Sequence, residues 1–231
     1  MSPKSLKNKV DETQRLGCIT EDLYVIHGFF RNSLSRADRL VALTSPQDQE
    51  RIKRIADYLE YLLDKLENHH IHEDVVLWDR LSQRAPEIKE DVERMKTHHN
   101  HVSHSIEELR SLISQWRSEP AKADQLAERL KEFYKDLDEH LSDEESSIRP
   151  VASRVIKQAE WNIMKDMGFK EIPKNRLMIE LGLMLQAAPN ETLRQGFWDD
   201  VPKPAQLLYK LFGKKQFEKE WNEIYGPIEQ G

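Results

Sequence analysis

The sequence predicts an all-α protein built on an antiparallel four-helix bundle, with additional short helices after it. Apolar residues recur at alternating steps of three and four positions, which places them on one face of a helix. The chain has only 8 Gly and 10 Pro, and its apolar residues rarely alternate with polar ones, so little or no sheet is expected. The clearest stripe consists of Leu126, Leu130, Phe133, Leu137, His140, Glu144, Ile148 and Val151.

Four such stretches follow one another, separated by breaks that contain proline. Ser45-Pro46 opens the second stretch, with Ser45 as the expected N-cap. Ala85-Pro86 and Pro120 separate the following stretches. Pro150 should kink the fourth helix or end its regular part, because proline cannot donate the helical hydrogen bond. The expected helices cover residues 16–41, 47–81, 87–117 and 121 onward.

Composition restricts the classes of function. The 231 residues are 38% hydrophobic and 33% charged, and the net charge of -6 provides no basic field for nucleic acid. No apolar run approaches the roughly 20 residues of a membrane span, and the first residues lack the apolar core of a signal peptide. The single cysteine, Cys18, excludes a disulfide within the chain. We therefore expect a cytoplasmic protein whose partners include neither nucleic acid nor a membrane.

Six residues interrupt the apolar stripes with side chains that bind metals. A carboxylate buried without a partner costs several kcal/mol, so each of the two glutamates needs a compensating group. Each pair of helices contributes one histidine and then a His-x-x-x-Glu pair, and this internal repeat brings all six to the middle of the bundle. They are His27, His69, Glu73, His99, His140 and Glu144.

These ligand types indicate a dinuclear metal centre. Imidazole and carboxylate ligands without thiolates suit iron, zinc, manganese or copper. Two carboxylates among four histidines favour two ions, because a carboxylate can bridge ions about 3.5–4 Å apart. With one oxo or hydroxo bridge, two octahedral ions would keep about two unfilled positions for a small molecule.

The order of these residues resembles that of hemerythrin-like, or HHE cation-binding, domains. Residues 66–77 and 140–150 are similar to the two signature blocks of the family, and the resemblance covers about residues 16–155. The C-terminal part looks like the helical extension of some bacterial members. The resemblance implies two iron ions in an oxo- or hydroxo-bridged centre that meets O₂, peroxide or another small anion. It also implies terminal ligands His27, His69, His99 and His140, with Glu73 and Glu144 as bridges.

Two departures from the oxygen-carrying members affect the expected function. The carriers have two histidines four apart on the third helix, whereas Ser103 stands four residues after His99. Their second acidic ligand is an aspartate at spacing five, whereas Glu144 stands at spacing four. One histidine fewer leaves an additional exchangeable position, which favours peroxide or O₂ chemistry, or iron handling, over carriage. Candidates to complete the ligand set are Tyr24, Tyr134 and His104.

The remaining histidines fall outside the apolar stripes, and we expect them to face solvent or lie at a rim. These are His70, His72, His98, His101 and His104. We expect an N-terminal tail over residues 1–15, the bundle over 16–159 and an extension of three or four short helices over 160–231. Aromatic side chains should hold the extension against the bundle, namely Trp161, Phe197, Trp198, Tyr209, Phe212 and Trp221.

The sequence leaves three functions open. The first is a di-iron protein that binds O₂ or peroxide, with a role in peroxide decomposition or oxidative stress. The second is an oxidase or oxygenase acting on a small organic substrate, with the extension as a lid or pocket. The third is an oxygen or iron sensor in which metal occupancy changes the docking of the extension. A helical bundle with a vestigial or zinc-filled site is the remaining alternative, and the oligomeric state stays open.

Overall fold

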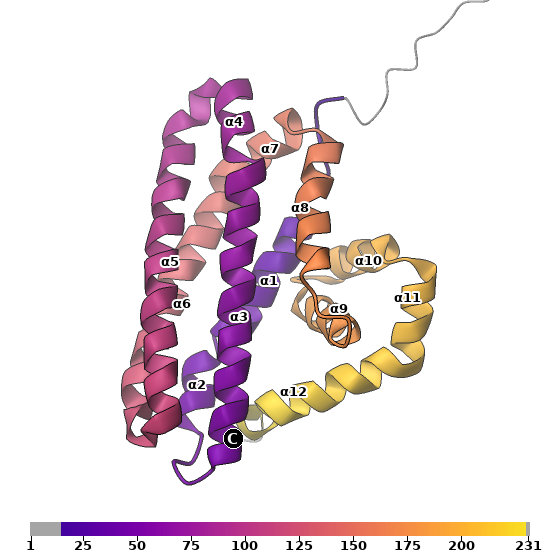
Figure 1. Ribbon diagram of the computed structural model, residues 1–231. Coiled ribbons are helices and arrows are strands. Elements are labelled where there is room, and N and C mark those ends of the chain that lie inside the picture. Colours follow the sequence, from indigo (N-terminus) through magenta and orange to yellow (C-terminus); the bar gives the residue numbers. More distant parts are fainter. Residues whose placement is uncertain (1–14, 230–231) are drawn as a thin grey trace, which may run out of the picture.

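The computed structural model describes residues 15–229 and confirms the all-α four-helix bundle with further helices after it (Figure 1). The predicted N-terminal tail lies outside the described residues except for Arg15. The bundle consists of α1 (Asp22–Leu34) with α2 (Ala37–Ala42), α3 (Gln49–Val76) with α4 (Trp78–Arg84), α5 (Lys89–Ser118), and α6 (Ala123–Asp143) with α7 (Arg149–Val155). Short 3-10 turns at Pro86–Ile88 and Pro120–Lys122 precede α5 and α6, at the predicted proline breaks.

The first two helices begin later than the sequence suggested. Leu16 forms an isolated bridge with Lys157 and stays outside the helix, which starts at Asp22. The N-cap of α3 is Asp48, and not Ser45, because the Asp48 carboxylate accepts a hydrogen bond from the backbone N–H of Arg51 at 2.9 Å.

The single first helix that the sequence predicted is divided between α1 and α2. This division lets α2 pack against α6 while α1 packs against α9 (Leu177–Ala187).

A π-helical turn, Glu144–Ile148, separates α6 from α7. Pro150 cannot donate the helical bond, and its ring crowds the carbonyl four residues before it. The wider turn accommodates this residue, because the backbone N–H of Arg149 bonds to the carbonyl of Glu144, five residues earlier. Such turns are frequent at functional sites. Here the turn begins at one of the predicted metal ligands.

The core of the bundle is divided into two clusters of buried apolar side chains. On α3, Leu66 belongs to the larger cluster and Val76 to the smaller one. On the fourth helix, Leu137 belongs to the larger cluster and Ile148 to the smaller. The His and Glu residues between these positions form a polar layer between the two clusters. An uncompensated polar layer at this depth would destabilise the fold.

Five helices follow the bundle among the described residues, where the sequence suggested three or four. They are α8 (Gln158–Lys170), α9, α10 (Glu191–Asp200), α11 (Lys203–Leu208) and α12 (Lys214–Glu229). A π-helical turn, Tyr209–Gly213, lies between α11 and α12. They lie along the side formed by α1 and α3, and α12 runs back to the base of the bundle (Figure 1). Trp161 is buried, and Phe197 and Trp221 pack against the larger cluster. Phe212, expected in this contact, is exposed instead.

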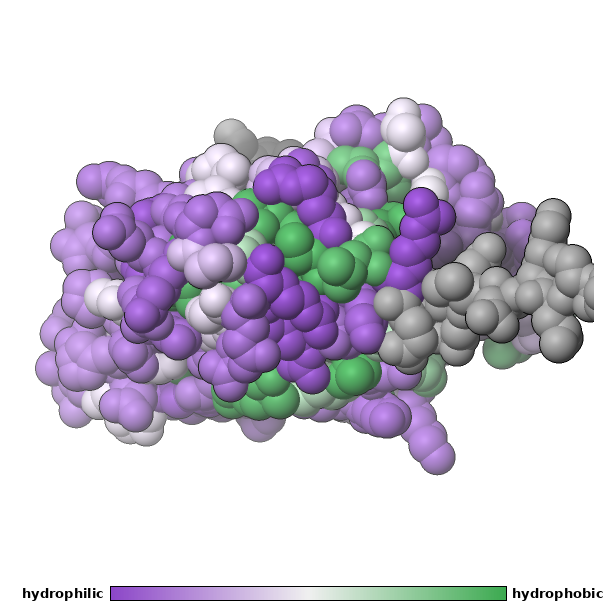
Figure 2. Space-filling model, turned by 90° about the horizontal axis from the view of Figure 1, so that it is seen from above, coloured by the Kyte–Doolittle hydropathy of each residue, from purple (hydrophilic) through white to green (hydrophobic). Residues whose placement is uncertain are grey.

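Hydrophilic residues cover most of the face seen from above, with hydrophobic residues gathered near its middle (Figure 2). None of the described helices combines the length and the apolar character that crossing a bilayer requires.

Candidate metal centre

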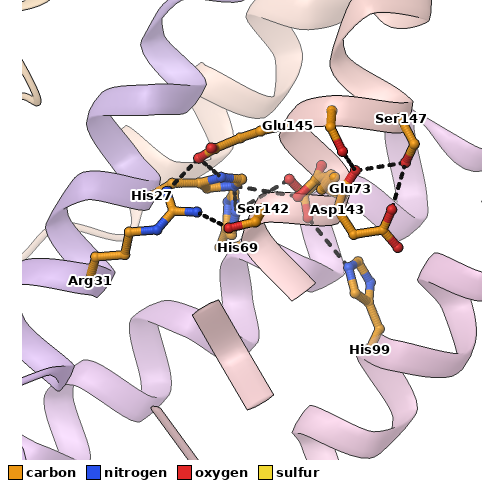
Figure 3. Close-up of polar contacts among 11 residues, drawn as sticks. His27, Arg31, His69, Glu73, His99, Ser142, Asp143, Glu145 and Ser147 are labelled. Carbon is orange, nitrogen blue, oxygen red and sulfur yellow. Dashed lines mark hydrogen bonds and ion pairs between the residues drawn. The ribbon is translucent and has the colours of Figure 1, made fainter. Parts of the chain in front are cut away.

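All six sequence-predicted ligands meet in the polar layer of the bundle. Helix α1 supplies His27, α3 supplies His69 and Glu73, α5 supplies His99, and the α6 segment supplies His140 and Glu144. Figure 3 shows His27, His69, Glu73 and His99 pointing toward one another from three helices. The ligand atoms form two groups, within each of which all lie within 4.8 Å of one another. One group is His27, His69, Glu73 and Glu144, and the other is His70, His99 and His140.

His70 is a ligand candidate that sequence reasoning missed. Its side chain is 2% exposed, so the expectation that it faces solvent is wrong. The His70 ring stacks on His99, with ring centroids 4.1 Å apart. The spacing did contain the signal, because His70 precedes Glu73 by three positions and His69 precedes it by four. Both spacings place side chains on one helix face. The candidate ligand set therefore has seven members, and its five histidines include the additional histidine whose absence was inferred from Ser103.

Glu73 has the orientation of a bridging carboxylate. Its Oε1 lies 3.2 Å from Nε2 of His69, and its Oε2 lies 3.6 Å from Nε2 of His99. The two oxygens of one side chain thus face histidines of the two different groups. Glu144 places its Oε2 3.4 Å from Nε2 of His27. Both carboxylates are almost completely buried.

The polar atoms of this layer fit a cation. Among the described residues, nine buried atoms of the ligand set have no hydrogen-bond partner: both carboxylate oxygens of Glu73 and of Glu144, both ring nitrogens of His70 and of His140, and Nε2 of His99. Each buried polar group left unsatisfied costs about 1–3 kcal/mol. So many unsatisfied atoms at one point would be prohibitive, whereas cations bound between them would satisfy carboxylates and imidazoles together.

An acidic residue directly after each glutamate orients a histidine on another helix. Glu145 accepts a hydrogen bond from Nδ1 of His27 at 2.8 Å, and Arg31 donates to the same carboxylate oxygen. Asp74 accepts from Nδ1 of His99 at 2.7 Å. Each bond leaves Nε2 of the histidine facing the other ligands, as is usual for metal-bound histidines. The repeat of Glu followed by an acid therefore has the same role in both halves of the bundle.

The protonation states favour metal binding by three of the histidines. Burial, together with the neighbouring histidines, lowers the pKa of His69 and of His70 well below the usual value. Burial likewise lowers the pKa of His140 to about 3. These imidazoles are neutral at pH 7, which is the form that binds a metal. Burial would lower the pKa of His27 too, but the carboxylates of Glu144 and Glu145 raise it.

The two buried glutamates shift in opposite directions. Burial and the nearby charge of Glu144 raise the pKa of Glu73 well above its usual value. Burial acts in the same sense on Glu144, but His27 and the other histidines lower its pKa. Without a cation, the buried pair of carboxylates therefore retains a proton at neutral pH. A cation bound by both would displace that proton, so metal binding should release it.

The other candidates make different contacts. His104 is exposed and lies 3.4 Å from a carboxylate oxygen of Glu108. Tyr24 lies under the guanidinium of Arg149, and Tyr134 packs against the larger apolar cluster. His72 is buried and bonds to Glu171, the residue after α8, at 2.8 Å, so the expectation that it faces solvent or lies at a rim is also wrong. His98 is half-buried, and His101 is exposed.

Comparison with known families agrees with this geometry. Residues 18–152, more than half of the chain, match the Hemerythrin HHE cation binding domain. The chain belongs to the hemerythrin HHE family. The matched residues of this hemerythrin domain include all seven members of the ligand set and end before α8 begins. No curated protein and no solved structure gave a match.

Proposed function

We propose that this chain is a cytoplasmic di-iron protein that binds O₂ or peroxide at one open position of its metal centre. In this proposal His27 and His69 bind one iron, and His70, His99 and His140 bind the other. Glu73 and Glu144 bridge the two. The observation that carries the proposal is the division of the ligand set into two groups, with the oxygens of Glu73 facing both.

The ligand count assigns the open position to one side of the centre. Two octahedral ions offer six positions each. The ion held by His70, His99 and His140 would have all six positions occupied, by these three histidines, the two bridging carboxylates and one oxo or hydroxo bridge. The ion held by His27 and His69 has one histidine fewer, so one position there is available to a small ligand. A bound di-iron centre supplies electrons for O₂ binding, or cycles between redox states during peroxide decomposition.

The surroundings of His27 and His69 favour a small ligand over an organic substrate. His27 is fully buried, and His69 has 14% of its side chain exposed, more than the others of its group. The Phe30 ring lies 5.4 Å from that of His69 and makes this side apolar. A surface hollow of about 450 Å³ is lined by residues of the extension and by none of the ligand set. These features give an oxidase or oxygenase less support than O₂ or peroxide binding.

The contact between the extension and the bundle gives the sensor hypothesis less support as well. Leu183, Met184 and Ala187 of α9 belong to the larger core cluster, together with residues of α1 and α3. At Gly28, a Cβ atom would lie 2.4 Å from the backbone oxygen of Ala187. Burial of this kind makes the extension part of the same core, so separating it would expose apolar surface of both parts.

The proposal is tested with the iron-loaded protein and two small ligands. Azide should change the near-ultraviolet and visible absorption of the centre, and hydrogen peroxide should be decomposed with release of O₂. His69→Ala should weaken azide binding, while His104→Ala, an exposed histidine on α5, should leave it unchanged. Zinc as the only metal that binds, or a spectrum that azide leaves unchanged at saturating concentration, would contradict an open di-iron position.

A further inference from the structure

The segment between α11 and α12 exposes a ridge of large apolar side chains. Leu207 and Leu208 are 59% and 49% exposed, and Leu211 and Phe212 are each 61% exposed. They belong to the end of α11 and the π-helical turn after it. Positions three and four apart on a helix lie on the same face, and Leu207 and Leu211, Leu208 and Leu211, and Leu208 and Phe212 have these spacings, so the four side chains form one continuous ridge. Exposed apolar groups gathered in this way mark interaction sites.

Lysines border the ridge. Lys203, Lys210, Lys214 and Lys215 are all exposed. Residues 203–216 contain these four lysines and no acidic residue, in a chain whose net charge is -6. Lys214 lies beside Glu218 of α12, with its Nζ 3.7 Å from a carboxylate oxygen, so the positive charge along the ridge is carried chiefly by Lys203, Lys210 and Lys215. Long lysine stems can lie along apolar surface while their ammonium groups reach a polar layer.

Two amphipathic aromatic residues lie beside the ridge. The rings of Trp198 and Tyr209 contact each other with centroids 5.8 Å apart. Lys210 places its Nζ 5.6 Å from the centroid of the Trp198 ring. Tryptophan and tyrosine are enriched where an apolar phase meets water, because each ring carries one polar group. Leucine, phenylalanine, lysine and these aromatics together have the composition of a helix that lies in a membrane interface.

We propose that this lysine-bordered ridge docks on the surface of an anionic lipid membrane. The four apolar side chains enter the headgroup region, and the lysines contact the phosphates of anionic lipids. The binding energy comes from buried apolar area and from electrostatic attraction to the lipids. Removing either the apolar side chains or the lysines should therefore weaken binding. This surface contact requires no membrane-spanning helix, so it departs from the expectation of no membrane partner, which rested on the lack of an apolar run long enough to span a bilayer. It is independent of the metal centre.

A second copy of the chain fits the ridge less well. In a two-fold symmetric dimer the same patch meets itself. The lysines of one copy would then approach those of the other, residues 203–216 contain no acid to compensate them, and Glu218 already faces Lys214 of its own chain. An anionic lipid surface presents the opposite charge to the same lysines and an apolar layer to the ridge.

The test is flotation of the full-length protein with lipid vesicles. One vesicle preparation is phosphatidylcholine alone, and the other contains about a third phosphatidylglycerol. We expect the protein to float with the anionic vesicles at low salt, to be released at about 0.5 M salt, and not to float with phosphatidylcholine alone. Release by salt distinguishes lipid charge from simple adsorption to a hydrophobic surface.

Paired variants separate the two contributions. Leu211→Glu with Phe212→Glu should reduce binding more than tenfold, and Leu43→Glu, a similarly exposed leucine after α2, should not change it. Lys210→Gln and Lys215→Gln should each reduce binding about fivefold. The matched control is Lys131→Gln with Lys135→Gln, two exposed lysines on α6. Because all these positions are exposed, circular dichroism should show unchanged folding.

Three results would overturn the proposal. The first is the absence of binding to anionic vesicles at low salt. The second is binding that the Leu211→Glu, Phe212→Glu variant retains in full. The third is a dimer in solution by light scattering that this same variant converts to a monomer, because the ridge would then be an interface between copies of the chain.

Discussion

Replacing His70 by leucine should affect the metal-free and the iron-loaded protein in opposite directions. His70 is buried, and neither of its ring nitrogens has a hydrogen-bond partner. In the metal-free protein this side chain is a destabilising feature, which the proposed role as a metal ligand would explain. Leucine is of similar size and has no polar atom, so it removes the unsatisfied nitrogens without leaving a large cavity.

The size of both effects follows from the contacts of the ring. An unsatisfied buried polar group costs about 1–3 kcal/mol. Loss of the stacked contact with His99 offsets about 0.5–1.5 kcal/mol of the gain. The metal-free variant should therefore be about 1 kcal/mol more stable, which corresponds to about 2–4 °C. With iron present, a 100-fold weaker affinity removes about 2.7 kcal/mol of ligand-linked stabilisation, which reverses the sign.

The assay is thermal unfolding of wild type and variant, each after chelator treatment and after anaerobic loading with Fe²⁺, together with iron content. Wild type should hold two irons per chain and the His70→Leu variant about one. His104→Leu is the matched control, because His104 lies on the exposed side of α5, and it should change neither quantity. Retention of two irons by the His70→Leu variant, or a loss of several kcal/mol in its metal-free form, would refute this reasoning.

The remaining predictions concern the surroundings of the ligand set. Glu145→Gln removes the charge that orients His27, and iron titration should show an affinity 10–100-fold weaker. Gly28→Ala places a Cβ against a backbone oxygen of α9, and chemical denaturation should show a loss of about 1–3 kcal/mol, whereas Gly168→Ala, with open space around it, should not destabilise. His140 has a folded pKa of about 3 and an unfolded pKa near 6.5, so its stabilising effect is complete above pH 6.5 and is lost as pH falls. His140 alone should lower the stability of the metal-free protein by about 2 kcal/mol between pH 7 and pH 5, while the lowered pKa values of His69 and His70 act in the same sense and the raised pKa of Glu73 acts in the opposite sense. Denaturant titration of metal-free wild type and His140→Leu at pH 5 and 7 isolates the His140 contribution, and a variant that loses as much stability on acidification as wild type would contradict it.

The bundle was predictable because its four helices carry regular apolar stripes and end at prolines. The division into α1 and α2 was not, since residues 35 and 36 contain neither proline nor glycine and the division depends on packing against α6 and α9. Three of the five helices of the extension, α9, α10 and α11, have 11, 10 and 6 residues, and so few turns show too little periodicity to be read from the sequence. Phe212 could not be assigned from sequence either, because an aromatic residue in a short helix has no stripe to fix its side.

Six residues of the candidate site were predictable because each stands at a position where the apolar stripe of its helix would otherwise continue. His70 escaped because a stripe was traced through only one of two adjacent histidines, although both lie within four positions of Glu73. The acids Asp74 and Glu145 were visible as a repeat, but their role depends on contacts between helices. Glu145 acts on α1 and Asp74 acts on α5, and a pairing between helices cannot be derived from spacing along one of them.

Counting the irons bound per chain tests the central claim most directly. Anaerobic Fe²⁺ titration of the metal-free protein, followed by removal of free metal, should give two irons per chain. Glu144→Ala should lose most of the bound iron, because the bridge joins both ions. A wild-type protein that binds a single iron, or a Glu144→Ala variant that keeps two, would contradict a centre of two ions bridged by Glu73 and Glu144.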